Sequence, residues 1–292
     1  MASRLQIAKA DIFQYFDNRP EKILKSSSIK SILTEQRAFW RLAQNTNSTA
    51  FVNFLIEHGK LKQLRFPFPY RSETRYTWGE VPFLEVVGSL KEGSYFTHYS
   101  AMRIHGLTEQ VPKTIYLNYE QRPHVQSGVL IQRSLDNAFK AKPRVSNNVI
   151  EFDDVRICLI NGMHTGALGV VEERVAYDAS GPAKVRVTNI ERTLIDIVVR
   201  PVYSGGVAEV LKAFEQAKDR ASVNRITAFL QKLNYLYPYH QTIGFYLERA
   251  GYSAAAVDLL RQFPMNFDFY LAQQMGQTDF VPSWRLHIPK GF

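Results

Sequence analysis

The residues of this sequence whose types and spacing could do chemistry begin with two histidines. His98 and His105 stand seven residues apart in a stretch whose apolar spacing predicts a helix. Seven residues correspond to about two helical turns, so the two imidazoles lie too far apart to share one metal ion without further ligands. No acidic cluster nearby supplies such ligands. We therefore expect a buried or hydrogen-bonding role for both histidines and no metal site.

Acidic residues and a lysine form a second group. Asp153, Asp154, Glu172, Glu173 and Lys184 can be combined into the acid–acid–lysine set of a metal-dependent nuclease. Such sets arise by chance in many chains, and Asp153 with Asp154 stands where a hairpin turn favours aspartate. Structural roles are therefore favoured for these residues, and a nuclease is the alternative. Metal-dependent cleavage of DNA that disappears in Asp154→Ala would identify a nuclease.

The other residue types do not assemble a recognisable catalytic or cofactor site. The sequence contains no nucleophile–base set, no phosphate-binding glycine loop and no metal cluster that stands out from chance. Its single cysteine, Cys158, lies in an apolar run, allows no internal disulfide and fits a reducing compartment. We expect a protein that is not an enzyme and that carries no cofactor.

A third group, of cations, could bind the phosphates of double-stranded DNA. Tyr70 and Tyr76 are interleaved with these cations, and Glu73 is the one acid among them. A solvated charged face is the alternative explanation, but charge of nearly one sign with interleaved aromatic residues favours nucleic acid. The candidate phosphate contacts are Lys60, Lys62, Arg65, Arg71 and Arg75.

Three polar residues just before these cations could read base edges. Asn47, Thr49 and Asn53 would lie at the entry to a helix and along its free face. Asn53 is the strongest of the three because asparagine can form two hydrogen bonds with adenine, although a merely solvated Asn53 is an equal alternative.

The elements that must position these side chains can be read from the apolar pattern. Ser48 precedes an apolar set at three- and four-residue spacing (Phe51, Phe54, Leu55, His58), and Gly59 follows it, which predicts a short capped helix. Two alternating strands around residues 67–71 predict a hairpin, and helices are expected at residues 11–16 and 28–42. Three helices followed by a basic hairpin are the plan of a winged helix-turn-helix, whose third helix enters the major groove.

Composition is consistent with that plan. The chain has 292 residues, 45% of them hydrophobic, which is enough for two domains with cores. A formal net charge of +9 favours polyanionic partners, although a basic protein without such a partner is the alternative. Residues 1–10 lack an apolar signal core and no apolar run reaches membrane-spanning length, so we expect a cytoplasmic protein without a membrane partner.

The predicted fold class is α+β, with an N-terminal winged helix-turn-helix followed by a larger mixed α/β domain with C-terminal helices. Trp78-Gly79 and Pro82 place the boundary between domains at 1–80 and 81–292. The second domain is expected to be sheet-rich over 95–187, mainly helical over 188–263, and to end in short strands over 266–292. Thr97 is a candidate helix cap, and Thr188 with Glu191 a capping box.

Two segments of the second domain resemble a known family. One reads His-Tyr-Ser-Ala…His-Gly-Leu-Thr followed by Gln-Val-Pro, and it contains His98 and His105. The other reads Glu-Arg-Thr-Leu-Ile-Asp…Arg-Pro…Gly-Gly, and it contains Glu191, Arg192 and Asp196, of which Arg192 and Asp196 can pair one turn apart. Both resemble the AbiEi family, the antitoxins of type IV toxin–antitoxin systems.

That resemblance implies a division of roles. The N-terminal domain would bind the operator DNA of its own operon and repress it. The second domain would counteract a nucleotidyltransferase-like toxin, without a stable complex between the two proteins. The main alternative is a stand-alone winged-helix transcriptional regulator whose second domain senses a signal or dimerises.

Overall fold

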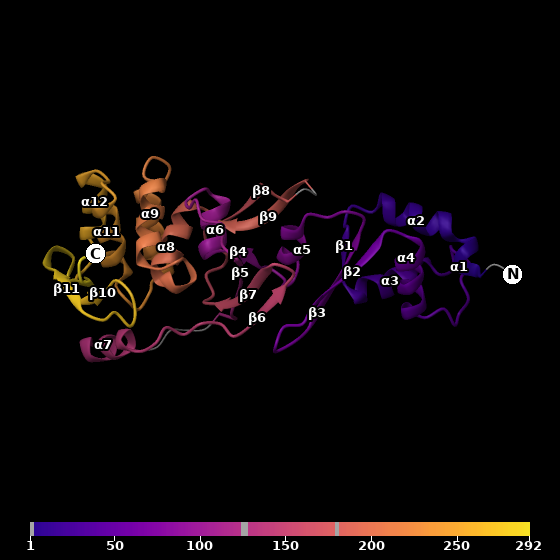
Figure 1. The fold of residues 1–292 in the computed structure, drawn as a ribbon, viewed down its shortest axis with the longest axis horizontal. Coiled ribbons are helices and arrows are strands. Elements are labelled where there is room, and N and C mark those ends of the chain that lie inside the picture. Colours follow the sequence, from indigo (N-terminus) through magenta and orange to yellow (C-terminus); the bar gives the residue numbers. More distant parts are fainter. Residues whose placement is uncertain (1–2, 124–127, 179–180) are drawn as a thin grey trace. The chain divides into compact units, whose positions relative to one another are not determined.

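A computed structural model of the chain describes residues 3–123, 128–178 and 181–292. The fold is mixed α+β, as predicted, and it divides into two compact units (Figure 1). The first unit is Met1–Glu92 together with Arg174–Val185, and the second is Gly93–Glu173 together with Arg186–Phe292. The boundary predicted after residue 80 therefore falls inside the first unit.

The first unit packs helices beside a three-stranded antiparallel sheet of order β1-β3-β2. The β2–β3 hairpin pairs in register from Leu61 opposite Trp78 to Phe66 opposite Glu73. In chain order the elements are α1 (Arg4–Ile7), α2 (Lys9–Asn18), β1 (Ile23–Leu24), α3 (Ser26–Gln36), α4 (Ser48–His58), β2 (Leu61–Phe66), β3 (Glu73–Trp78) and α5 (Phe83–Gly88).

Aromatic side chains fill the core of the first unit. Phe16 of α2 stacks on Trp78 of β3 with ring centroids 4.9 Å apart, and Phe51 of α4 lies against Phe16 from another side. Gly59 ends α4, as predicted, for a reason of space. A Cβ atom there would lie 2.6 Å from the carbonyl oxygen of Leu55 and 2.9 Å from the Trp78 ring, so only glycine allows this close approach.

The second unit contains most of a larger sheet and the C-terminal helices (Figure 1). The six-stranded sheet has the order β6-β7-β5-β4-β9-β8, and a small sheet near the C-terminus has the order β10-β12-β11. The strands are β4 (Tyr95–Phe96), β5 (Thr114–Glu120), β6 (Val149–Phe152), β7 (Val155–Gly162), β8 (Val170–Asp178), β9 (Gly181–Thr188), β10 (Phe269–Tyr270), β11 (Thr278–Val281) and β12 (Leu286–Pro289). The helices are α6 (His98–Ile104), α7 (Gln132–Lys140), α8 (Ile190–Val199), η1 (Pro201–Tyr203), α9 (Val207–Ala217), α10 (Val223–Leu233), α11 (Tyr239–Arg249), α12 (Ala254–Arg261) and η2 (Pro282–Trp284).

Helix α8 lies at the centre of the second unit, since every residue from Glu191 to Val198 is buried. Its apolar side chains join those of α9, α10 and α11 in one core. Trp284 is fully buried against α11, where a Cβ atom at Gly244 would collide with its ring. None of the helices within the described ranges is both long and apolar enough to cross a bilayer.

Several predicted local features were wrong. Residues 128–131 precede α7 without strand structure, although they lie inside the range 95–187 that was predicted to be sheet-rich. The cap of α4 is Asn47, whose Oδ1 accepts from the backbone N–H of Ala50 at 2.8 Å, and not Ser48. The cap of α8 is Asn189 and not Thr188, so the predicted capping box does not form. At the start of both α4 and α8, the capping residue, which has extended backbone, lies one position away from the predicted cap.

Candidate functional site

Helix α4 presents a polar face opposite its core face. Phe51, Phe54 and Leu55 are buried, whereas Thr49 and Asn53 are exposed. This is the helical periodicity expected from the sequence, and it leaves both predicted base contacts accessible. Asn47 is also exposed, but its side-chain oxygen is used by the cap, so a base contact would have to use its amide nitrogen.

Arg37 fixes the turn that leads into α4. Its guanidinium donates to the carbonyl oxygens of Ala43 at 2.6 Å and Thr46 at 2.9 Å. These bonds fold the chain back after Gln36, which is why α3 ends there and not at Leu42 as predicted. The direction of α4 is therefore set by a charged side chain bound to backbone carbonyls.

The predicted cations of the hairpin fall into three groups. Arg65 and Arg71 are exposed, and within the described part of the chain neither has an ion-pair partner. Lys60 pairs with Asp17 at 2.9 Å, and Lys62 pairs with Glu80. Hydrogen bonds from Lys60 and Trp78 lower the pKa of Asp17. Exposed pairs of this kind contribute about 0–1 kcal/mol, so both lysines can exchange their carboxylates for phosphates at little cost.

Arg75 is not a phosphate contact, contrary to the prediction. Its side chain is 3% exposed, and its guanidinium donates to the carbonyl oxygens of Ser89 and Leu90, both at 2.8 Å. It also pairs with Glu73 at 3.2 Å. Arg75 therefore attaches the hairpin to the segment after α5, and no donor remains free for DNA.

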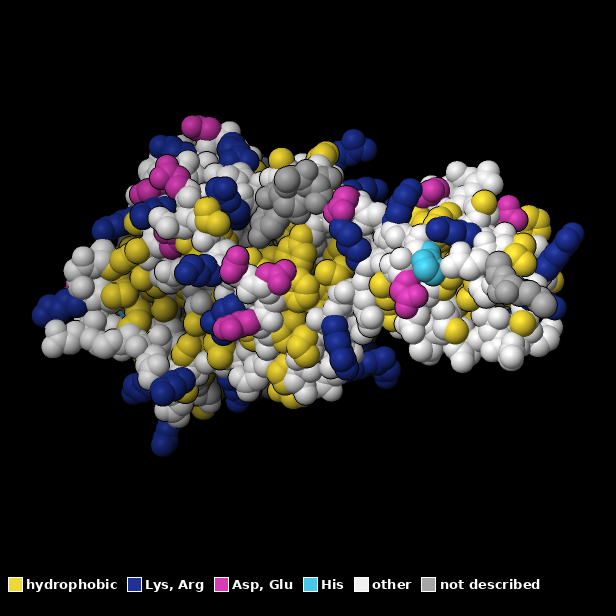
Figure 2. Space-filling model, turned by 45° about the vertical axis from the view of Figure 1, so that its right-hand side comes forward, with side chains coloured by type: hydrophobic (Ala, Val, Ile, Leu, Met, Phe, Trp, Pro, Cys, Tyr) yellow, Lys and Arg dark blue, Asp and Glu magenta, His cyan; other side chains and the backbone are white. Residues whose placement is uncertain are grey.

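The charge of the whole surface does not by itself mark a site. On the face shown in Figure 2, Lys and Arg side chains lie over both units, and Asp and Glu side chains are interspersed among them. A nucleic-acid interface therefore has to be argued from the individual side chains of α4 and the hairpin.

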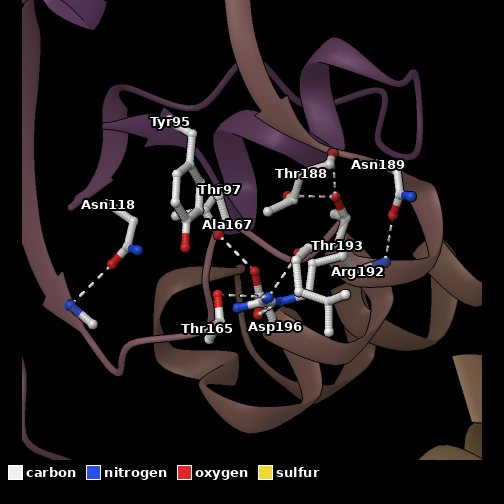
Figure 3. A network of polar contacts seen from close by, with 12 residues as sticks. Tyr95, Thr97, Asn118, Thr165, Ala167, Thr188, Asn189, Arg192, Thr193 and Asp196 are labelled. Carbon is white, nitrogen blue, oxygen red and sulfur yellow. Dashed lines mark hydrogen bonds and ion pairs between the residues drawn. The ribbon is translucent and has the colours of Figure 1, made fainter. Parts of the chain in front are cut away.

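In the second unit, α6 and α8 are in contact, and they carry parts of the two segments quoted in the sequence analysis. Thr97, at the start of α6, donates from its hydroxyl to Asp196 of α8 at 2.9 Å (Figure 3). Arg192 donates from Nε to the other carboxylate oxygen of Asp196 at 2.7 Å, which is the pair predicted from their spacing. Thr97 was expected to cap α6, but its hydroxyl is used by Asp196 and makes no cap bond.

A loop after β7 completes the surroundings of Arg192. The guanidinium donates to the carbonyl oxygen of Leu168 at 2.9 Å and to the hydroxyl of Thr165 at 3.3 Å. Glu120, at the end of β5, holds this loop by accepting from the backbone N–H groups of Thr165 and Ala167 at 2.9 and 3.1 Å. Burial would raise the pKa of Glu120, but these hydrogen bonds outweigh it and lower the pKa.

His98 occupies an unusual position in this network. It is 7% exposed and has a φ angle of 51°, the left-handed region that residues other than glycine rarely adopt. Burial lowers the pKa of its imidazole to about 4, and among the described residues no partner binds its Nδ1. The ring meets Tyr203 edge-on with centroids 5.3 Å apart. His98 is therefore a neutral imidazole at pH 7.

The other two residues of the resembling segments lie outside this network. His105 follows the end of α6, and its Nε2 lies 2.6 Å from the carbonyl oxygen of Thr188, to which it donates. Glu191 is buried and accepts from the backbone N–H of Ser222 at 3.0 Å and from Arg225 at 3.3 Å, which attaches α8 to the start of α10. Both contacts are structural.

An open cavity of about 1060 Å³ adjoins the Arg192–Asp196 pair, and His98 also lines it. Its walls include Tyr235, in the segment before α11, and Tyr239, the first residue of α11. The sequence analysis did not name either tyrosine as a site residue. The concentration of tyrosines at 235–239 was the signal available. Glu120 and Thr165 carried weaker signals, an acid at the end of a predicted strand and a threonine in a loop.

The acidic residues considered for a nuclease do not meet. Asp153 and Asp154 form the turn between β6 and β7, with Asp153 at a φ angle of 49°, as expected for a turn aspartate. This turn directly follows β6, whereas Glu172 and Glu173 lie on β8, and β6 and β8 stand at opposite ends of the sheet order. Over the described residues, no group of three or more His, Cys, Asp or Glu side chains could hold a metal ion.

Comparison with known proteins shows a likeness in fold to a solved structure. No family model matches this sequence, and no curated protein matches it either. Among solved structures, the crystal structure of the RV2827C protein from Mycobacterium tuberculosis is similar, with a TM-score of 0.60 and 13% sequence identity. The likeness covers 97% of this chain and 91% of that chain. At this identity it shows a shared fold over nearly the whole length and carries no function with it.

Proposed function

We propose that this chain is a DNA-binding regulator whose first unit is a winged helix-turn-helix. The observation that supports this most is the element order α2-β1-α3-α4-β2-β3, with β1 added to the edge of the β2–β3 hairpin beside β3. In this arrangement α4 is the recognition helix and the hairpin is the wing. The free polar face of α4 and the unpaired cations of the hairpin agree with those roles.

The side chains divide into reading and positioning groups. Asn53 and Thr49 would contact base edges in the major groove, because they project from the face of α4 that is not used by the core. Arg65 and Arg71 would bind phosphates, and Lys60 and Lys62 would do so after leaving Asp17 and Glu80.

Binding of the full chain to the duplex upstream of its own gene tests this proposal. We expect Asn53→Ala to weaken binding to the preferred duplex by roughly 5- to 150-fold, equivalent to 1–3 kcal/mol, with a much smaller loss on unrelated DNA. Asn137→Ala, at an exposed asparagine on α7, is the matched control and should bind as the unmodified chain does. Equal losses on all duplexes would remove Asn53 from the reading group, and no binding at low salt would reject the DNA-binding role.

We further propose that the second unit has the antitoxin role implied by the resemblance to the AbiEi family. The supporting observation is that α6 and α8, which carry parts of the two resembling segments, are in contact, and that Thr97, just before the first segment, bonds to Asp196 of the second. A neighbouring gene for a nucleotidyltransferase-like toxin would be co-expressed with the full chain. Rescue by a variant with Asn53→Ala, Arg65→Ala and Arg71→Ala would separate the antitoxin role from repression. Failure of the unmodified chain to rescue would favour the stand-alone regulator.

A further inference from the structure

The cavity of the second unit is large enough for a small-molecule ligand. Its volume of about 1060 Å³ lies just above the range of roughly 300–1,000 Å³ that such pockets occupy. Every residue that lines it belongs to the second unit. Ligand binding in this cavity can therefore be tested independently of DNA binding by the first unit.

Tyrosine rings form much of the cavity wall. Tyr235 and Tyr239 meet edge-on with ring centroids 5.3 Å apart, and Tyr237 adjoins Tyr239 at 6.1 Å. Burial raises the pKa of Tyr235 and Tyr239, so both remain neutral phenols. Aromatic walls with neutral hydroxyl groups favour a planar ring in the ligand, stacked or edge-on against them.

The charged groups that line the cavity leave a surplus of positive charge. Among the described residues that line the cavity, Asp196 alone is acidic, and its two oxygens are bound by Arg192 and Thr97. Arg144 and Arg200 are exposed at the cavity, and no carboxylate within the described ranges pairs with either. The guanidinium of Arg200 donates one hydrogen bond to the backbone carbonyl oxygen of Arg144 at 2.7 Å, which holds the two residues together. Two arginines that line the same cavity and have no carboxylate partner favour a phosphate or a carboxylate there.

His98 supplies a third indication. Its side chain is more than nine-tenths buried and lines the cavity, yet its Nδ1 has no hydrogen-bond partner among the described residues. Leaving a buried polar atom unpaired is unfavourable, so such atoms in folded proteins are normally bound by another group or by water. The left-handed backbone at His98 adds to this, because strained residues persist where the surroundings hold them in place.

We propose that this cavity binds a small anionic aromatic molecule. Arg200 and Arg144 bind the acid group of the ligand, and its planar ring lies against Tyr235 and Tyr239, in the part of the cavity that His98 also lines. A nucleotide and an aromatic carboxylic acid share this chemistry, and the experiment separates them.

Calorimetric titration of the full chain with two probes, AMP and indole-3-acetate, tests the proposal. Adenosine and indole supply the ring alone, and inorganic phosphate and acetate supply the anion alone. We expect at least one of the two probes to bind with a Kd below roughly 1 mM, and at least about tenfold more tightly than either of its parts. The probe that binds identifies the source of the anion as phosphate or carboxylate.

Variants of the lining residues locate the binding. Arg200→Gln should weaken the probe by about tenfold or more, and Tyr239→Leu should weaken it as well, whereas Arg133→Gln, an exposed arginine on α7, should have no effect. Arg200 is exposed, so its variant keeps the test valid if Tyr239→Leu does not fold. The proposal is overturned if neither probe binds at that concentration, or if binding is unchanged in Arg200→Gln.

Discussion

Asp196 is the residue on which the polar interior of the second unit depends. Its side chain is 9% exposed. One carboxylate oxygen accepts a hydrogen bond from Arg192, and the other accepts one from Thr97. Arg192 is 5% exposed and stays charged, so its guanidinium needs this counter-charge. The pair is therefore far more sensitive to loss of one member than an exposed pair of the same length.

The first prediction compares two aspartates that are each 2.7 Å from an arginine. Asp196→Asn should lower the free energy of unfolding by about 3–5 kcal/mol, because it leaves Arg192 charged, buried and unpaired. Asp258→Asn breaks an exposed pair with Arg261 and should cost no more than about 1 kcal/mol. Urea unfolding at pH 7 measures both. Equal losses for the two variants would show that burial of the Arg192–Asp196 pair is unimportant.

The second prediction concerns the pH dependence of stability at His98. Because the folded-state pKa is lowered to about 4 from 6.5, the unfolded chain binds a proton at His98 between these values and the folded chain does not. Stability therefore falls as the pH is lowered through this window, by up to about 3 kcal/mol in total. The charged and titratable groups that face His98 are Asp196, Arg192, Arg200, Tyr116 and Tyr203.

His98→Asn isolates this contribution, because asparagine tolerates the left-handed backbone better than most residues. Between pH 7 and pH 4.5, we expect the variant to lose about 2 kcal/mol less stability than the unmodified chain, measured by urea unfolding at both pH values. His240 also has a pKa lowered to about 4 by burial and is present in both proteins, so its contribution cancels. Identical losses in the two proteins would contradict a neutral, buried His98.

At the residue scale, the sequence predicted only the local part of this network. The Arg192–Asp196 pair was predictable because one helical turn separates the two residues. The bond from Thr97 to Asp196, the loop held by Glu120 and the left-handed backbone of His98 were not predicted. Each depends on which elements pack together, and residue spacing along one element does not contain that information.

At the scale of elements, the β2–β3 hairpin has two different faces. Tyr76 and Trp78 turn toward the helical core, whereas Arg75 and Glu73 turn toward the segment around α5, where Glu73 also pairs with Lys91 at 2.8 Å. Alternation along the sequence predicted the two strands correctly. It gave no means of separating the buried Arg75 from the exposed Arg71, because the covering segment comes later in the chain.

The third prediction follows from these two faces. Arg75→Met should lower the free energy of unfolding by at least about 2 kcal/mol, because it leaves the buried carbonyl oxygen of Leu90 and the partly buried one of Ser89 without this donor. Arg65→Met, on the exposed part of β2, is the control and should change it by no more than about 0.5 kcal/mol. Chemical unfolding monitored by tryptophan fluorescence reports on both, since Trp78 lies in this core. A cost for Arg75→Met as small as that of the control would contradict its buried, bonded position.

At the scale of the whole molecule, the apolar pattern predicted an α+β fold and the length predicted two parts, and the structure has both features. The predicted boundary at residue 80 differs from the division of the structure after Glu92, because the Pro and Gly residues at 79–82 lie inside the first unit. A return of the chain at Arg174–Val185 also belongs to this unit, where the N–H of Lys184 donates to Glu85 at 2.8 Å. Local composition around residue 80 does not reveal that a segment nearly 100 residues later packs in the same unit.

The fourth prediction tests this boundary with two fragments. Residues 1–80 lack the carbonyl groups that bind Arg75, whereas residues 1–92 retain them. We expect fragment 1–80 to be less stable than 1–92 by at least about 2 kcal/mol and to be digested faster by protease under native conditions. Both fragments lack the returning segment, so the comparison isolates residues 81–92. Equal stability would support a boundary at residue 80.

DNA binding by the first unit is the central claim, and its salt dependence tests that claim most directly. The affinity of the full chain for a duplex carrying its own upstream sequence would be measured by fluorescence anisotropy over a series of salt concentrations. Two double variants would be compared. The hairpin variant combines Arg65→Ala and Arg71→Ala. The control combines Arg133→Ala and Arg220→Ala, and it removes two exposed arginines from the second unit. We predict that log affinity falls linearly with log salt concentration, and that only the hairpin variant has a shallower slope, by about 0.9 per lost phosphate contact. The same slope in both variants, or no binding at low salt, would contradict DNA binding through the hairpin.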